Sequence, residues 1–195
     1  MSIFMGNLVH LRRFCIIMKS RGKKRHDTVK DRITKAFLEL LDNRSYHEIT
    51  IVDIVEAAQS GRVSFYRNFR DKDDVLRYYI FRETDKWMNK TKDSYVLPTQ
   101  ENIKPYIIWL LDHMYEYRFF TDMLKANGKL YLIEEEFDRR FFKRLSEMDS
   151  PLEIAYTVGG LYKLFEFWAE NGYKETPREV AEIVGNTSGS ACDDI

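Results

Sequence analysis

Apolar residues recur at helical spacing along most of the chain, whereas no segment shows the strict alternation of a half-buried strand. The pattern is clearest over about residues 28–43, where apolar side chains fall three and four positions apart and so lie on one face of a helix. The residues of this face are Val29, Ile33, Ala36, Phe37, Leu40 and Leu41. The sequence therefore predicts an amphipathic helix here.

Two shorter helices are predicted next. Thr50 followed by Asp53 is a capping box, so a helix should begin at Thr50. A turn around residues 59–61 separates it from a short helix over about 62–68. Asp71 is placed to cap a longer helix that continues to about residue 93.

Helix signals continue to the C-terminal region. Further helices are expected over about 100–117 and 130–148, with Gly128 as a break before the second. Ser150-Pro151-Leu152-Glu153 and Thr176-Pro177-Arg178-Glu179 each combine a hydroxyl N-cap, a proline at the first helical position and a glutamate at the third. They predict helices over about 151–171 and 177–185, giving an all-α chain of about nine helices.

Basic and acidic residues are distributed unevenly along the chain. The formal net charge is zero, with 31 basic and 31 acidic residues, but residues 1–72 hold 15 basic and 8 acidic residues while residues 73–195 hold 16 and 23. A basic N-terminal third on an acidic molecule indicates that one end meets a polyanion. The basic run Lys19–Arg25 is interpreted either as a flexible arm that touches a polyanion or as a solubilising tail.

Several classes of protein do not fit the sequence. Cys15 and Cys192 lie near the two ends, which argues against a disulfide framework and favours the cytoplasm. No apolar run approaches the roughly 20 residues of a membrane span. The four histidines stand outside metal-ligand spacing, and neither a glycine-rich phosphate loop nor a nucleophile elbow is present. We therefore expect no enzyme, metal, cofactor or membrane association.

The short helix over 62–68 carries the candidate chemistry. Three short helices joined by tight turns are the geometry of a helix-turn-helix, whose last helix can enter the major groove of DNA. Phe65 and Phe69, four positions apart, are expected to anchor this helix to the core. The side chains able to donate hydrogen bonds to phosphates or base edges are Arg62, Ser64, Tyr66, Arg67 and Asn68.

These residues resemble the TetR family of bacterial transcription regulators. The stretch Ile49–Ile54 resembles that family's second helix, and Arg62–Leu76 resembles its recognition helix and the start of the next helix. The resemblance implies that Thr50, Tyr66 and Lys72 grip phosphates. It also implies that Arg62, Val63, Ser64 and Arg67 face the groove. Gln59, Ser60 and Gly61 depart from the family pattern, which leaves open whether the turn is shifted by one residue.

The C-terminal two-thirds are rich in large apolar residues, most of which an all-helical domain needs for its core. By the resemblance, such a domain encloses an effector pocket between its central helices, with a few polar groups among aromatic ones. The hypothesis is an apolar or aromatic small molecule bound among Trp109, His113, Phe137, Tyr156 and Phe165. The last two long helices, with Gly159-Gly160 in the first of them, resemble the family's homodimer interface.

The residue pattern and the family resemblance together predict the domain organisation. Residues 1–24 are expected to be a disordered basic extension, 25–72 the DNA-binding domain, 73–185 the effector-binding and dimerisation domain, and 186–195 a disordered tail. The predicted function is a cytoplasmic, dimeric, sequence-specific regulator that binds double-stranded operator DNA, as a repressor controlled by a small molecule. A co-activator, or a helical adaptor that acts through a protein partner, remains as the alternative.

Overall fold

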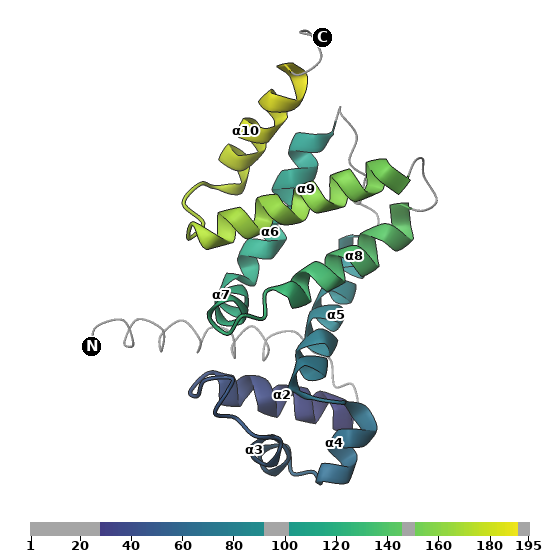
Figure 1. Cartoon of the computed structure of the whole chain (residues 1–195), viewed down its shortest axis with the longest axis vertical. Helices are drawn as coiled ribbons and strands as arrows, with labels where there is room; N and C mark the ends of the chain where they lie inside the picture. The colour runs from purple at the N-terminus through teal and green to yellow at the C-terminus, as the bar shows by residue number, and fades with distance from the viewer. Residues whose placement is uncertain (1–27, 92–101, 146–150, 191–195) are drawn as a thin grey trace, which may run out of the picture. The chain divides into compact units, whose positions relative to one another are not determined.

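The computed structural model describes residues 28–91, 102–145 and 151–190, and these residues form nine helices and no strand (Figure 1). The prediction of an all-α chain is confirmed. The helices, labelled as in Figure 1, are α2 Val29–Leu41, α3 Ile51–Ala57, α4 Arg62–Asn68, α5 Lys72–Thr91, α6 Ile103–Glu116, α7 Arg118–Ala126, α8 Tyr131–Leu145, α9 Pro151–Glu170 and α10 Pro177–Ser190. The basic run Lys19–Arg25 and both cysteines lie outside the described residues.

Helix starts agree well with the sequence. Thr50 Oγ1 accepts the Asp53 backbone N–H at 3.2 Å while the Thr50 backbone N–H donates to the Asp53 carboxylate at 2.7 Å, which completes the predicted capping box. Thr176 and Glu179 form the same pair before α10. Asp71 accepts the Asp74 backbone N–H at 2.8 Å at the start of α5.

The C-terminal helix is longer than its sequence suggests. α10 continues to Ser190 and so includes residues from 186 on that were expected to be disordered. Its middle packs against α6, where the Lys104 ammonium donates to Glu182 at 2.7 Å and to the Asn186 side-chain oxygen at 2.9 Å. Tertiary contact therefore extends a helix whose small polar residues have low helix propensity on their own.

The chain forms two compact units. One consists of the chain up to Asp85 together with Met123–Leu132, and the other of Lys86–Asp122 and the chain from Ile133 on. The first unit thus takes in the end of α7 and the turn before α8, far along the sequence from the helix-turn-helix. The functional boundary after residue 72 stays a prediction.

The first unit has a core of large apolar side chains at which α2, α3, α4 and α5 meet. Its fully buried members include Ile33, Phe37, Ile54, Phe65, Val75 and Leu76. Most of the predicted apolar face of α2 is buried here, while Val29 and Leu40 are half-buried. This packing fixes α4, which is too short to be stable alone.

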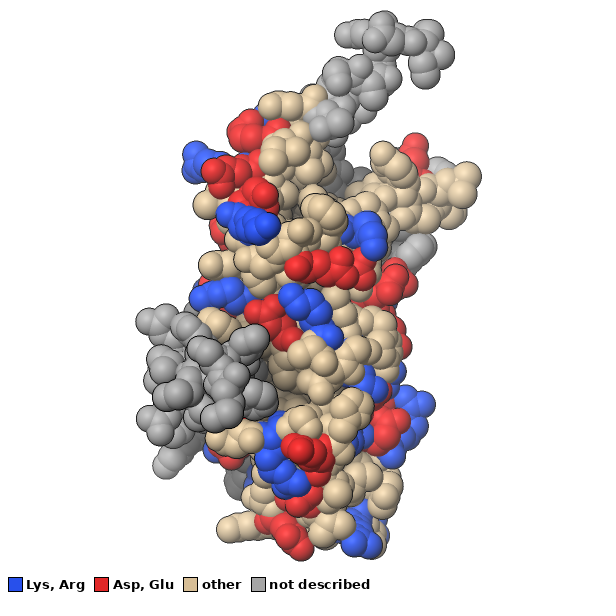
Figure 2. Space-filling model, turned by 60° about the vertical axis from the view of Figure 1, so that its left-hand side comes forward, with Lys and Arg blue, Asp and Glu red and all other residues tan. Residues whose placement is uncertain are grey.

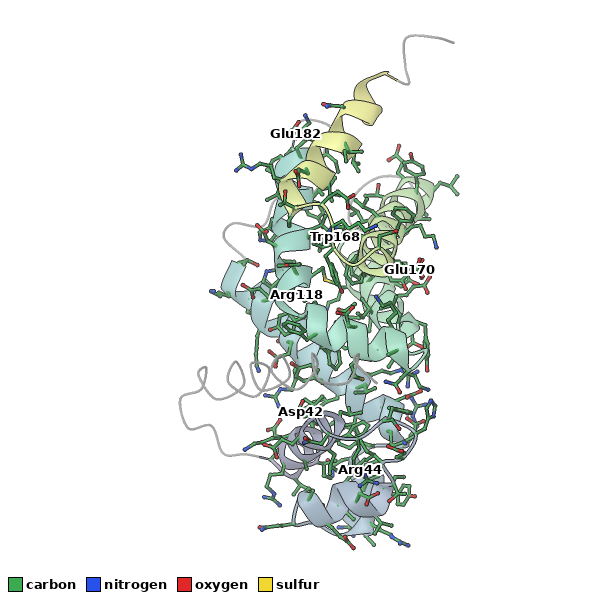
Figure 3. All side chains as sticks on the ribbon, turned by 90° about the vertical axis from the view of Figure 1, so that its left-hand side faces the viewer. Asp42, Arg44, Arg118, Trp168, Glu170 and Glu182 are labelled. Carbon is green, nitrogen blue, oxygen red and sulfur yellow. The ribbon has the colours of Figure 1, made fainter. Side chains whose placement is uncertain are left out.

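The second unit is built from α6, α8, α9, α10 and parts of α5 and α7. Its most buried side chains include Ile107, Leu110, Leu111, Phe165 and Trp168. Trp168, labelled in Figure 3, donates its indole N–H to the Glu175 carbonyl at 2.8 Å. No helix in the described residues is both long and apolar enough to cross a membrane.

Candidate nucleic-acid interface

α4 presents one face to solvent and buries the other. Phe65 and Phe69 are 0% and 3% exposed, and their rings lie 5.8 Å apart. Val63 and Tyr66 are 65% and 60% exposed. The predicted anchoring of α4 is therefore confirmed.

The exposed face contains most of the predicted groove-facing residues. Arg62 and Arg67 are exposed beside Val63 and Tyr66, and the four positions follow each other at helical spacing on one side of α4. Guanidinium groups can donate to phosphates or bidentately to guanine edges, and the Tyr66 hydroxyl can donate to a phosphate. Chemically, this face can bind a nucleic acid.

Two of the predicted DNA-contact residues, Asn68 and Ser64, do not lie on the exposed face of α4. Asn68 is half-buried and its amide donates to the Ser64 backbone carbonyl at 2.7 Å, so this side chain closes the last turn of its own helix. Ser64 is also half-buried. In this structure, both residues lie between the anchoring face and the exposed face of α4.

The turn before α4 contains a residue in a left-handed conformation. Gln59 adopts a left-handed conformation with φ of 49°, and Gly61 is the N-cap with extended backbone angles and no side-chain capping bond. The left-handed region costs an L-residue with a Cβ roughly 1–2 kcal/mol. Gln59 therefore carries backbone strain in this turn, and α4 begins at Arg62.

Lys72 has a more buried setting than a surface phosphate contact. Its ammonium donates to the backbone carbonyls of Tyr46 at 2.6 Å and Ile49 at 2.7 Å, and it lies 4.2 Å from the centroid of the Tyr46 ring. Burial lowers the pKa of Lys72. An ammonium group has three donors, so one remains for a phosphate while two hold the loop between α2 and α3.

Thr50 is exposed at the start of α3, next to an arginine that sequence reasoning did not single out. Arg44, labelled in Figure 3, pairs with Asp53 at 3.0 Å and donates to the Glu48 carbonyl at 2.7 Å. The hydrogen bonds from Thr50 and Arg44 lower the pKa of Asp53. Arg44 thus fixes the loop that leads into α3.

Charges of both signs lie on the visible face of this unit. Figure 2 shows basic and acidic side chains interspersed over the part of this face where the helices of the first unit lie. Two carboxylates of this unit, Asp53 and Asp74, are paired with Arg44 and Arg70. The described residues include no group of three or more His, Cys, Asp or Glu able to hold a metal ion.

The five predicted effector residues fall into different settings within the second unit. Trp87 stacks on Trp109 at 4.0 Å and on His113 at 3.9 Å between ring centroids. Phe137 and Phe165 are buried and stack at 6.3 Å. Tyr156 is 85% exposed, so the structure does not place it with the others.

His113 is the most strongly perturbed histidine among the described residues of this unit. Burial lowers its pKa to about 3, so the imidazole is neutral at physiological pH. Trp87, which sequence reasoning missed, lies over this ring with an interplanar angle of 3°. Trp87 lies near the end of α5, 26 residues before His113. At this separation, no local sequence pattern indicates that the two rings stack.

The N-terminal part of the chain matches a known protein family. Residues 33–79 match the family of bacterial regulatory proteins of the tetR type. The chain is 25% identical over 109 residues, 56% of its length, to the HTH-type dhaKLM operon transcriptional activator DhaS of Lactococcus lactis subsp. lactis (strain IL1403). It covers 52% of that relative, so it spans about half the length of the curated protein it matches.

A solved structure shares the fold. The fatty acid degradation regulator FadR from Bacillus halodurans superposes with a TM-score of 0.50 and 17% identity, over 87% of this chain and 99% of that one. At this identity the likeness concerns the arrangement of helices alone.

Proposed function

We propose that this chain, a member of the TetR family of bacterial regulatory proteins by its N-terminal domain, is a cytoplasmic transcription regulator that binds operator DNA through α4. The observation that carries the proposal is the exposed face of α4, where Arg62, Val63, Tyr66 and Arg67 project from a helix anchored by two buried phenylalanines. Arg62 and Arg67 supply base and phosphate donors, while Val63 offers an apolar contact.

Salt dependence provides the first test. Each phosphate contact releases counterions, so the logarithm of affinity should fall with the logarithm of salt concentration by about 0.9 per contact. A dimer with two sets of Arg62, Tyr66 and Lys72 gives roughly 6 contacts or more. Titration of a mixed-sequence duplex between about 50 and 200 mM salt measures this slope. A slope near zero would exclude DNA binding by this surface.

The roles of individual side chains separate in a second measurement. Tyr66→Phe should weaken binding about equally on mixed-sequence DNA and on an operator selected from a random pool, because phosphate contacts carry no sequence information. Arg67→Ala should lose preference for the selected operator. Lys174→Ala removes an exposed cation from the other unit and serves as the control. If Arg67→Ala keeps the preference of the wild type, the assigned base contact is wrong.

A homodimer through α9 and α10 accounts for the apolar surface of these helices. The exposed fractions are 81% for Leu152, 85% for Tyr156, 63% for Phe167 and 62% for Ile183. Next to them, a Cβ added at Gly159 or Gly160 would meet nothing within 4 Å. Glycines cost helix stability, and a closely approaching partner helix gives this position a use for them. Tyr156 accordingly belongs to the proposed dimer face and not to an effector site.

Repression relieved by a small molecule is the proposed mode of control. The stacked rings of Trp87, Trp109 and His113 form an uncharged aromatic cluster in the second unit, which supports an apolar or aromatic effector. If such a ligand lowers operator affinity, saturating operator must lower ligand affinity by the same factor, typically about 5- to 150-fold. Titration of candidate ligands with and without operator tests this reciprocity, and equal affinities would reject a ligand as the inducer.

Activation is the second candidate, because the relative DhaS is described as a transcriptional activator. In that case the regulator acts together with a protein partner and the effector does not release it from DNA. A reporter gene behind the selected operator distinguishes the modes. Deletion of the regulator raises expression under repression and lowers it under activation.

A further inference from the structure

A cluster within the first unit joins the turn between α7 and α8 to the helix-turn-helix. The Lys129 ammonium and the Tyr131 hydroxyl donate to one oxygen of Asp73 at 2.8 and 2.7 Å. The Tyr46 hydroxyl donates to the other Asp73 oxygen. We call these four residues the Asp73 bridge.

The bridge connects three separate parts of the sequence. Tyr46 lies in the loop between α2 and α3, and Asp73 lies in the first turn of α5. Lys129 lies in the turn before α8, and Tyr131 is the first residue of α8. Gly128, with φ of 65°, forms the turn that presents Lys129. Lys129 also lies 4.9 Å from the centroid of the Tyr46 ring, which gives it a second contact with the same loop.

The Asp73 bridge is partly buried, so breaking one of its contacts should have a measurable effect. The side chains of Lys129 and Asp73 are 20% and 16% exposed, so their pair is screened less than a surface ion pair. Burial alone would raise the pKa of Asp73, but the hydrogen bonds from Lys129, Tyr46 and Tyr131 hold it below its usual range. Removing one donor leaves a half-buried carboxylate poorly satisfied.

Lys72 connects the bridge to the candidate interface. Its ammonium lies over the Tyr46 ring at 4.2 Å and donates to the Tyr46 carbonyl, so the position of Tyr46 sets the position of Lys72. The same ammonium binds the Ile49 carbonyl immediately before Thr50, the other predicted phosphate contact. Two DNA-contact candidates therefore depend on the loop that the bridge holds.

We propose that Lys129 and Tyr131 are positioning residues for DNA binding, which act through Asp73 and Tyr46 to hold Lys72 and Thr50 where they meet phosphates. This inference rests on the proposed function. It adds that a turn far along the sequence, whose own residues need not touch DNA, sets the affinity of the helix-turn-helix. Any change that withdraws this turn from Asp73 weakens DNA binding.

The test compares four variants with the wild type on a mixed-sequence duplex over a range of salt. Lys129→Met should lower affinity several-fold and reduce the salt slope by about 0.9 for each phosphate that the variant no longer binds. Lys129→Arg keeps the ion pair and should retain wild-type binding. Tyr131→Phe removes one hydroxyl and should weaken binding less. Lys174→Met removes the same charge elsewhere and should leave the slope unchanged.

Amide hydrogen exchange at residues 46–50 gives a readout that does not involve DNA. Faster exchange there in Lys129→Met, together with a lower salt slope, supports the proposal. A salt slope equal to that of Lys174→Met overturns it, even if Lys129→Met unfolds more easily, because a purely stabilising role predicts that result. If Lys129→Met fails to fold, Tyr131→Phe decides by the same criteria. A wild type that does not bind DNA refutes the proposed function itself.

Discussion

Gln59 has a backbone conformation that suits glycine better than glutamine. Its φ of 49° lies in the left-handed region, and a glycine there has no Cβ to clash with the backbone. We expect Gln59→Gly to raise the free energy of unfolding by about 0.5–1 kcal/mol. Gln59→Ala keeps the Cβ and should give no such increase. Urea unfolding of the three proteins measures the effect, and equal stability of all three would show that the turn is unstrained.

His113 makes the stability of the second unit sensitive to acid. The pKa of His113 is about 3 in the folded protein, below the ordinary value of 6.5. At a pH between these two values, His113 is protonated in the unfolded chain and neutral in the folded chain. His113 therefore leaves the free energy of unfolding unchanged above about pH 6.5 and lowers it as the pH drops below that value. By about pH 5 the decrease in unfolding free energy should be on the order of 1–2 kcal/mol. The opposite sign applies to Asp42, whose pKa burial raises to about 6.

The variant His113→Gln isolates this contribution. Chemical unfolding at about pH 7 and pH 5 should show a smaller decrease in stability for His113→Gln than for the wild type. Substitution of the exposed His47 by Gln should leave the wild-type decrease in place. An identical decrease in His113→Gln and the wild type would mean that other groups cause the acid sensitivity.

Individual residues were predictable where their partners are close in sequence. The Thr50 and Asp53 capping box and the pair Phe65 and Phe69 involve partners three or four positions apart, so spacing alone identified them. Lys72 was matched to a phosphate-gripping position, but its bonds to Tyr46 and Ile49 span 26 and 23 positions. Only the folded chain brings such partners together.

Among the helices, α10 depends on a close approach to α6. A Cβ at Gly185 would overlap the aliphatic part of Lys104. Helix propensity alone favours alanine over glycine by about 1 kcal/mol, whereas the overlap opposes it. We therefore expect Gly185→Ala to give little or no stabilisation in the wild type. In a Lys104→Ala background, the same substitution should stabilise.

A double-mutant cycle measures this difference. The two substitutions should be non-additive by roughly 0.5 kcal/mol or more in unfolding free energy, since the residues are in contact. The control pair combines Gly61→Ala with Lys104→Ala, because Gly61 has open space around it and lies in the other unit, so the two should be additive. Additivity at Gly185 would mean that Lys104 moves aside without cost.

Helix boundaries were predicted well at N-termini and poorly at the end of α10. N-terminal signals are local hydrogen bonds, as Thr176 and Glu179 show. The extension to Ser190 follows contacts of Lys104 with Glu182 and Asn186, across 78 and 82 positions. Tyr156 is exposed although it was predicted to line a pocket, because an aromatic residue on α9 suits a core and an interface equally by its composition.

At the scale of the whole molecule, the proposed dimer is the clearest consequence of the surface. Burying apolar area stabilises association by about 25 cal/mol per Å². The double variant Leu152→Lys with Tyr156→Lys should therefore sediment as a monomer. Its helix content should be unchanged, since both side chains are over 80% exposed in the single chain. Analytical ultracentrifugation and circular dichroism measure the two properties.

The control for this prediction lies on the other unit. Tyr66→Lys introduces the same change at a side chain that is 60% exposed on α4, and it should remain dimeric. A dimeric Leu152 and Tyr156 double variant would place the subunit contact elsewhere than this face of α9.

The three tryptophans of the chain are Trp87, Trp109 and Trp168, and all belong to the second unit. Their ultraviolet emission therefore reports on that unit alone, and protonation of His113 against Trp87 should quench it. The first unit contains no tryptophan, so tryptophan emission does not follow its unfolding. Unfolding curves recorded by tryptophan emission and by far-ultraviolet circular dichroism should coincide if both units melt as one cooperative block. Two separate transitions would mean that each unit keeps its own melting temperature, and the emission curve would identify which transition belongs to the second.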